Sequence, residues 1–204
     1  MKRYAYVSLV LGAIALVCAA LIAGVYLLTN PFVLMNEENR IKDTYSKIFS
    51  EYYSNEELSF TEDEKGYIKK KVIAYDSNGN ELGYIYMTYG KNSYGAISLM
   101  IGIVDDKVID VEFLENTESF ASTVNTYVKS NFPSSDESII QINPYEVNNE
   151  ISIDDLSKDA VDLIDTRCGA TFGATLVKSM VIAALDEAKG GDTVWKNYLL
   201  KKLF

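Results

Sequence analysis

The stretch of sequence that decides the fold spans residues 96–114 and reads AISLMIGIVDDKVIDVEFL. Two apolar runs, Ala96–Val104 and Val108–Leu114, flank the polar turn Asp105-Asp106-Lys107. Short runs rich in Ile and Val on either side of a polar turn are typical of an antiparallel hairpin. The first run is apolar at nearly every position, which predicts a strand in the interior of a sheet.

A second hairpin is predicted just before the first. The runs Tyr67–Tyr75 and Leu82–Tyr89 are rich in Ile, Val and Tyr, and residues 76–80 between them read DSNGN. The Asn78-Gly79 pair favours the positive φ angles of a tight hairpin turn. Together the two pairs predict four antiparallel strands.

Helical patterns surround these strands. Apolar residues predict a short helix over 118–131, and Ser138–Ile142 is suited to rejoin the sheet; a turn of helix is expected around Asp154–Lys158. A longer amphipathic helix is predicted from residues at helical spacing, namely Val177, Met180, Val181, Ala184, Leu185 and Ala188. Gly190-Gly191 is predicted to stop it, and Trp195, Leu199 and Leu203 mark a last amphipathic helix. The pattern predicts one domain of the α+β class.

The amino-terminal segment is predicted to be a membrane anchor. Between Arg3 and Glu37 the chain has no charged residue, and Ala5–Leu28 is apolar apart from a single Ser. As a helix this run is long enough to cross the ~30 Å hydrocarbon layer. A cleaved signal peptide is the alternative, but its apolar core is ordinarily shorter. Lys2 and Arg3 favour a cytoplasmic amino terminus, which makes the later residues extracytoplasmic and the chain a single-pass protein of the cell membrane.

The predicted organisation divides the chain into four parts. Residues 1–35 form the transmembrane anchor, 36–66 a helical connector in which Asn36 can cap the helix, 67–190 the extracytoplasmic domain, and 191–204 a carboxyl-terminal amphipathic helix.

Composition excludes several classes of function. The 204 residues carry a net charge of −10, contain no His and include only two Cys. The acidic balance argues against nucleic-acid binding, which needs a basic surface. The absence of His rules out His-based zinc sites and Ser-His-Asp triads, and we expect no metal site and no catalytic residues in this chain.

The segment Asp165–Thr171, which reads DTRCGAT, stands immediately before the longer amphipathic helix. Free backbone amides at a helix start, together with the helix dipole, make a seat for a phosphate group. Gly169 and Ala170 allow a close backbone approach, Thr171 supplies a hydroxyl group, and Arg167 or Lys178 can offset anionic charge. The same residues also suit an ordinary capped turn, so spacing alone leaves both interpretations open.

This segment resembles the flavinylation motif of FMN-binding domains, Asp-x-x-Ser/Thr-Gly-Ala-Thr. The motif occurs in the G subunit of the Rnf electron-transport complex and in the related C subunit of the sodium-translocating NADH:quinone reductase. The chain is also similar to this Rnf protein in residues 25–32, Gly83-Tyr84, Tyr94–Ile103 and Val111–Glu118.

The resemblance implies a membrane-anchored flavoprotein with an antiparallel-sheet FMN-binding domain. A separate flavin transferase would join the phosphate of FMN to Thr171 as an ester. The flavin would relay electrons among partner subunits of an ion-translocating, Rnf-type ferredoxin:NAD+ oxidoreductase. The chain would thus be an electron carrier rather than a self-contained enzyme. The expected cofactor-binding residues are Thr171, Gly169, Ala170, Cys168, Asp165 and Arg167, with Tyr94 as a contact to the flavin ring.

The sequence departs from the family pattern at three places. Cys168 replaces Ser or Thr, as a flavin-contacting thiol or a small buried side chain, and residues 172–175 add a second Gly-Ala-Thr. Thr171 is favoured over Thr175 as the acceptor because Asp165 stands six positions before Thr171, whereas Gly169 stands six before Thr175. The stretch 116–120 lacks the proline and glycines that ordinarily follow the Glu-Thr of the family.

Two other functions remain open from the sequence. One is a stand-alone flavinylated protein of extracellular electron transfer. The other is an anchored assembly or binding module that carries no flavin. A hydrolase is disfavoured because no Lys or carboxylate cluster stands beside a nucleophile.

Overall fold

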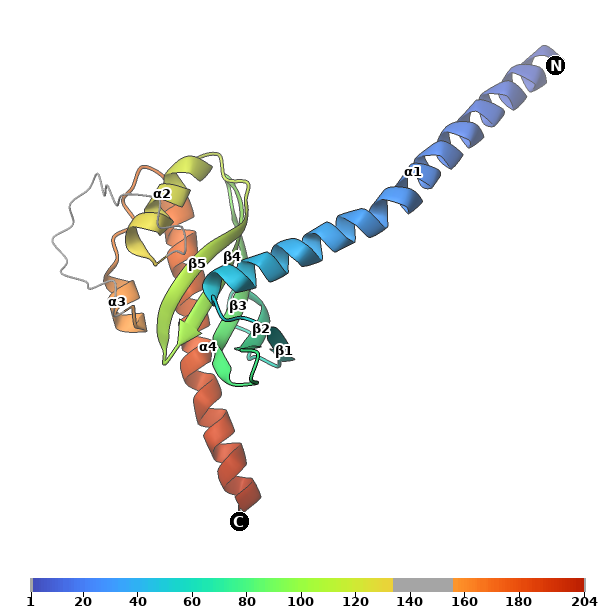
Figure 1. The fold of residues 1–204 in the computed structure, drawn as a ribbon. Helices are drawn as coiled ribbons and strands as arrows, with labels where there is room; N and C mark the ends of the chain where they lie inside the picture. Colours follow the sequence, from blue (N-terminus) through green and yellow to red (C-terminus); the bar gives the residue numbers. More distant parts are fainter. Residues whose placement is uncertain (1, 134–155, 204) are drawn as a thin grey trace. The chain divides into compact units, whose positions relative to one another are not determined.

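The structure, a computed structural model, describes residues 2–133 and 156–203 (Figure 1). The chain divides into two compact units, Met1–Asp43 and Thr44–Phe204. The first unit is formed by helix α1 (Lys2–Ile48), whose last residues belong to the second unit. The helix continues through Pro31 and Asn36, so the cap predicted at Asn36 is wrong.

Helix α1 has the character of a membrane span. Its apolar side chains are exposed around the helix, as at Leu16, Ile22 and Leu28. A helix that is apolar on all sides has no single face to bury in a soluble core. Among the described residues, α1 is the one helix long and apolar enough to cross a membrane. This agrees with a single-pass membrane protein.

The second unit is built on a five-stranded antiparallel sheet in the order β1-β2-β3-β4-β5. The strands are β1 (Ser54–Leu58), β2 (Ile68–Tyr75), β3 (Glu81–Asn92), β4 (Gly95–Val104) and β5 (Lys107–Asn116). Both predicted hairpins, β2–β3 and β4–β5, are confirmed, and β4 has a neighbour on each side. The expectation of four strands missed β1, which lies in the segment predicted to be helical.

The helices of this unit are α2 (Ala121–Asn131), α3 (Lys158–Leu163) and α4 (Thr171–Leu203). Helix α2 confirms the short helix predicted over 118–131. Helix α4 runs on through Gly190 and Gly191, so the predicted stop is wrong. Glycine inside a helix costs only about 1 kcal/mol, which does not end a helix without a capping motif. The strand expected at Ser138–Ile142 lies outside the described residues.

The main core lies between the sheet and α4. Buried side chains of β4 at alternate positions, Ile97, Leu99, Ile101 and Ile103, join one cluster with the buried face of α4. That face includes Ala174, Leu176 and all the residues predicted from the helical spacing: Val177, Met180, Val181, Ala184, Leu185 and Ala188. Figure 1 shows α4 crossing the sheet, and the contacts of α4 with β2, β3 and β4 place it on one face.

The opposite face of the sheet is covered by the segment Tyr45–Phe49. A methyl group at Gly102 would approach Ile48 Cγ2 to 2.4 Å, and one at Gly83 would approach the Phe49 ring to 2.9 Å. Tyr45 and Phe49 are buried, and the Tyr45 hydroxyl donates to Met87 Sδ at 3.8 Å. Because β4 is covered on both faces, its sequence is a nearly continuous apolar run.

Candidate functional site

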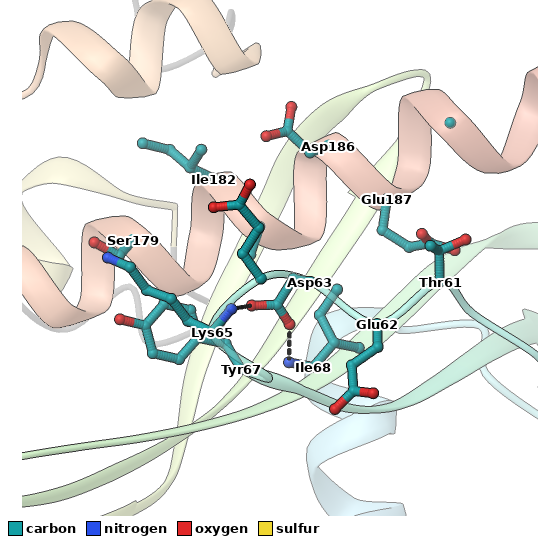
Figure 2. Close-up of a pocket in the computed structure, with 13 residues that line it drawn as sticks. Thr61, Glu62, Asp63, Lys65, Tyr67, Ile68, Ser179, Ile182, Asp186 and Glu187 are labelled. Carbon is teal, nitrogen blue, oxygen red and sulfur yellow. Dashed lines mark hydrogen bonds between the residues drawn. The ribbon is translucent and has the colours of Figure 1, made fainter.

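A cavity of about 700 Å³ lies between the loop before β2 and α4, away from the residues predicted to bind a cofactor (Figure 2). Its wall is rich in carboxylates, several of which are already engaged. Asp63 accepts hydrogen bonds from the backbone N–H groups of Lys65 and Ile68 at 3.2 and 2.9 Å. Asp186 pairs with Lys158, and Glu187 lies 3.5 Å from the buried Lys71 ammonium. Among the described residues no group of acidic, Cys or His side chains is arranged to hold a metal ion.

The predicted motif forms the loop between α3 and the first turn of α4, and Thr171 is the first residue of α4. Gly169 has φ +81°, a conformation that glycine adopts at little cost. A methyl group at Gly169 would meet only Thr123 Cγ2, at 4.0 Å. This glycine is therefore required by backbone conformation rather than by space.

The first turn of α4 presents unused backbone donors. The first hydrogen bond of this turn runs from Ala174 N–H to the Ala170 carbonyl oxygen, at 3.0 Å. Within the described part of the chain, no acceptor is found for the backbone N–H groups of Thr171, Phe172 or Gly173. Three free donors at the positive end of a long helix are suited to bind an anionic group.

Three exposed aromatic rings gather at this helix start. The Tyr94 ring lies 5.5 Å from the Phe172 ring and 6.3 Å from the Phe120 ring, measured between centroids. Their exposed fractions are 43% for Tyr94, 54% for Phe120 and 65% for Phe172. Aromatic residues on the surface are suited to stack on a planar ligand. We call Tyr94, Phe120 and Phe172 the aromatic trio.

The aromatic trio and the motif line one small cavity of about 230 Å³. The lining residues are Tyr94, Glu118, Phe120, Gly169, Ala170, Thr171, Phe172 and Gly173. Ligand pockets ordinarily enclose about 300–1,000 Å³. The cavity is thus too small to enclose a large cofactor by itself and is suited to hold part of one.

Glu118 is the buried polar residue of this lining, with only 6% of its surface exposed. Asn92 Nδ2 donates a hydrogen bond to Glu118 Oε1, and Asn92 Oδ1 accepts from the backbone N–H of Tyr94 at 2.7 Å. A methyl group at Gly173 would lie 3.1 Å from Glu118 Oε1 and 2.5 Å from Val124 Cγ2. Gly173 thus lets Glu118 and α2 approach the first turn of α4 closely.

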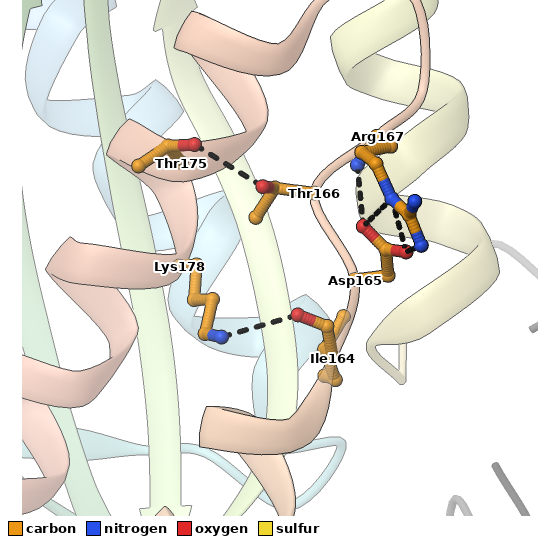
Figure 3. A network of polar contacts seen from close by, with 6 residues as sticks. All are labelled: Ile164, Asp165, Thr166, Arg167, Thr175 and Lys178. Atoms are coloured by element: carbon orange, nitrogen blue, oxygen red, sulfur yellow. Dashed lines mark hydrogen bonds and ion pairs between the residues drawn. The ribbon is translucent and has the colours of Figure 1, made fainter.

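Asp165 and Arg167 form a local pair at the other side of the loop (Figure 3). Asp165 Oδ1 accepts from the Arg167 backbone N–H at 2.8 Å, and Asp165 Oδ2 accepts from Arg167 Nε at 2.8 Å. Hydrogen bonds from the Arg167 side chain and backbone hold the pKa of Asp165 below its ordinary value. In this arrangement Arg167 is engaged with Asp165 and does not line the cavity.

The remaining residues near the motif point to other partners. Lys178 Nζ donates to the Ile164 carbonyl oxygen at 3.1 Å (Figure 3). It also donates to the Asp162 carbonyl oxygen at 2.6 Å, so it binds the end of α3 rather than facing the cavity. Thr175 Oγ1 lies 3.3 Å from Thr166 Oγ1. Cys168 packs against the core cluster and is partly buried.

The structure therefore brings together four of the seven predicted residues: Tyr94, Gly169, Ala170 and Thr171. Asp165, Arg167 and Cys168 shape the loop outside the cavity lining. Sequence reasoning missed Glu118, Phe120, Phe172 and Gly173. Phe172 could have been predicted, because it is an aromatic residue directly after Thr171. Glu118 could not, because its approach to α4 depends on tertiary packing.

Comparison with known proteins adds one finding. Residues 2–48 match the family described as RnfG N-terminal region. No curated protein matches the chain. The family match covers α1, so residues 2–48 are similar to the amino-terminal region of RnfG proteins.

Proposed function

We propose that this chain is a membrane-anchored flavoprotein subunit that carries FMN as a phosphate ester of Thr171 and relays electrons within an Rnf-type complex. The observation that carries the proposal is the position of Thr171. It stands at the first turn of α4, beside free backbone donors and in the lining shared with the aromatic trio.

The residues present fit both ends of FMN. The N–H groups of Thr171, Phe172 and Gly173 are suited to donate hydrogen bonds to the phosphate oxygens. The aromatic trio offers a surface for the flavin ring. When bound, FMN supplies one- and two-electron redox chemistry, which the side chains of this protein do not provide.

A covalent ester suits a cavity of this size. About 230 Å³ encloses only part of a large cofactor, so contacts alone would hold it weakly. A tether raises the effective concentration of the ring at the aromatic trio without any further contact. The site then needs to orient the ring rather than enclose it.

The proposed membrane topology rests on the positions of charged residues near the amino terminus. Lys2 and Arg3 precede the apolar part of α1, which favours a cytoplasmic amino terminus and an extracytoplasmic second unit. The proposed partners are other subunits of the complex and a flavin transferase that attaches FMN during maturation.

Co-expression of the full chain with a flavin transferase tests the proposal. Flavin fluorescence should stay with the denatured protein band in a gel, because an ester survives unfolding. Thr171→Ala should abolish the fluorescence, and Thr175→Ala is the matched control that should retain it. An unlabelled wild-type band, or loss of label in Thr175→Ala alone, would contradict the proposal.

A further inference from the structure

We propose that Glu118 sets the electrostatics of the flavin site and keeps the midpoint potential of the bound flavin low. This inference rests on the proposed function and adds to it a residue that acts on the cofactor through charge.

The charge balance of the lining supports the proposal. Among the described residues that line the 230 Å³ cavity, Glu118 alone carries a charged side chain. The two cations that the sequence offered for this site are engaged elsewhere, Arg167 with Asp165 and Lys178 with the end of α3. The lining described here therefore contains one buried carboxylate and no side-chain cation to balance it.

The burial of Glu118 makes its charge effective. With 6% of its surface exposed, the carboxylate is poorly screened by water and salt, so it acts on its surroundings at a lower effective dielectric than a surface group. The Asn92 amide and the positive end of α4 stabilise the negative charge in place. Gly173 permits this close approach because any side chain there would collide with Val124 and Glu118.

The negative charge of Glu118 determines the direction in which the midpoint potential of the flavin should shift. Reduction brings two electrons to the flavin from an added reductant, while protons come from solvent. A fixed negative charge beside the site opposes the negative charge that arrives with the electrons, which lowers the midpoint potential. Removing that charge should raise the potential.

The test compares flavin-loaded full chains with the substitutions Glu118→Gln and Glu115→Gln. Glu118→Gln keeps the size of the side chain and an oxygen that accepts from Asn92, whereas Glu115→Gln removes an equal charge from an exposed position on β5. Reductive titration against a reference dye should show a positive shift for Glu118→Gln that persists at high salt. The shift for Glu115→Gln should be smaller and should vanish with salt.

Visible circular dichroism of the flavin checks that the ring keeps its orientation in Glu118→Gln. An unchanged potential in a loaded Glu118→Gln chain with unchanged dichroism would overturn the inference while leaving the proposed function intact. Wild-type protein without flavin would instead overturn the proposed function.

A measurement on unloaded chains keeps the inference testable if Glu118→Gln acquires no flavin. Inorganic phosphate should raise the melting temperature of Glu118→Gln more than that of the wild type, because the buried anion no longer repels it from the first turn of α4. Equal effects of phosphate on both chains would overturn the inference.

Discussion

At the scale of single residues, Tyr127 carries a buried hydroxyl group that should be dispensable for stability. The residue is 4% exposed, and no partner for its hydroxyl is found among the described residues. A buried donor without an acceptor costs about 1–3 kcal/mol. We predict that Tyr127→Phe raises the free energy of unfolding by about 1 kcal/mol, measured by thermal unfolding of the full chain in detergent.

The control for this prediction is Tyr94→Phe, because the Tyr94 side chain is exposed. Burial raises the pKa of Tyr127, and Cys168 and Asp165 add to the shift. Because the unfolded chain ionises this phenol at the ordinary pKa of about 10 and the folded chain only at a higher pH, the protein loses stability as pH rises from about 10 through the folded-state value. Tyr127→Phe should therefore weaken the alkaline loss of stability. A less stable variant would mean that the hydroxyl has a partner.

Two glycines of α4 differ in the space around them: Gly173 lies in a close contact, whereas Gly190 stands at an ordinary helix position. A methyl group at Gly173 would lie 2.5 Å from Val124 Cγ2, whereas one at Gly190 would meet nothing within 4 Å. We predict that Gly173→Ala costs about 1–3 kcal/mol through overpacking and reduces flavin loading. Gly190→Ala should gain up to about 1 kcal/mol from helix propensity. Urea unfolding of both variants measures the two changes in unfolding free energy. Equal changes would contradict the close contact at Gly173.

Apart from Tyr94, the site residues that the sequence predicted are close neighbours in the chain. Gly169, Ala170 and Thr171 were found because a motif before a helix is a local signal. Glu118 was not found, because its role depends on β5, β3 and α4 meeting around Asn92 and Gly173. A spacing of 26 residues between Asn92 and Glu118 has no periodicity that a sequence pattern can reveal.

At the scale of elements, the two hairpin turns use positive φ angles in different ways. Gly79 has φ +82° with nothing within 4 Å of an added methyl group, so its role is conformational. Asp105 and Asp106 adopt φ 50° and 61° without being glycine. We predict that Gly79→Ala costs about 1 kcal/mol and that Asp106→Gly gains about 0.5 kcal/mol. Thermal unfolding of the full chain tests both, and a gain from Gly79→Ala would contradict the turn geometry.

Elements were predictable where their apolar pattern was strong. Strands β2 to β5 and the buried face of α4 were predicted because burial on a sheet or helix leaves a regular apolar spacing. Strand β1 left no such pattern, since Ser54, Asn55, Glu56 and Glu57 are exposed and the strand depends on backbone pairing with β2. The end of α4 was misjudged because Gly190-Gly191 resembles a helix stop but lies in a helix that continues.

At the scale of the whole molecule, the two units should separate by truncation within α1. A chain that begins at Asn36 retains Tyr45, Ile48 and Phe49, which cover one face of the sheet. We predict that this chain leaves the membrane fraction and stays soluble. A chain that begins at residue 50 should aggregate, because each buried side chain it loses contributes about 1.5–3 kcal/mol. Cell fractionation checks both, and a membrane-bound chain from Asn36 would contradict α1 as the anchor.

The most direct test of the account is tandem mass spectrometry of one tryptic peptide. Cleavage after Arg167 and Lys178 releases Cys168–Lys178, which contains both Thr171 and Thr175. For protein matured with a flavin transferase, the account predicts the mass of FMN, joined as a phosphate ester, on Thr171. An unmodified peptide, or FMN located on Thr175, would contradict it.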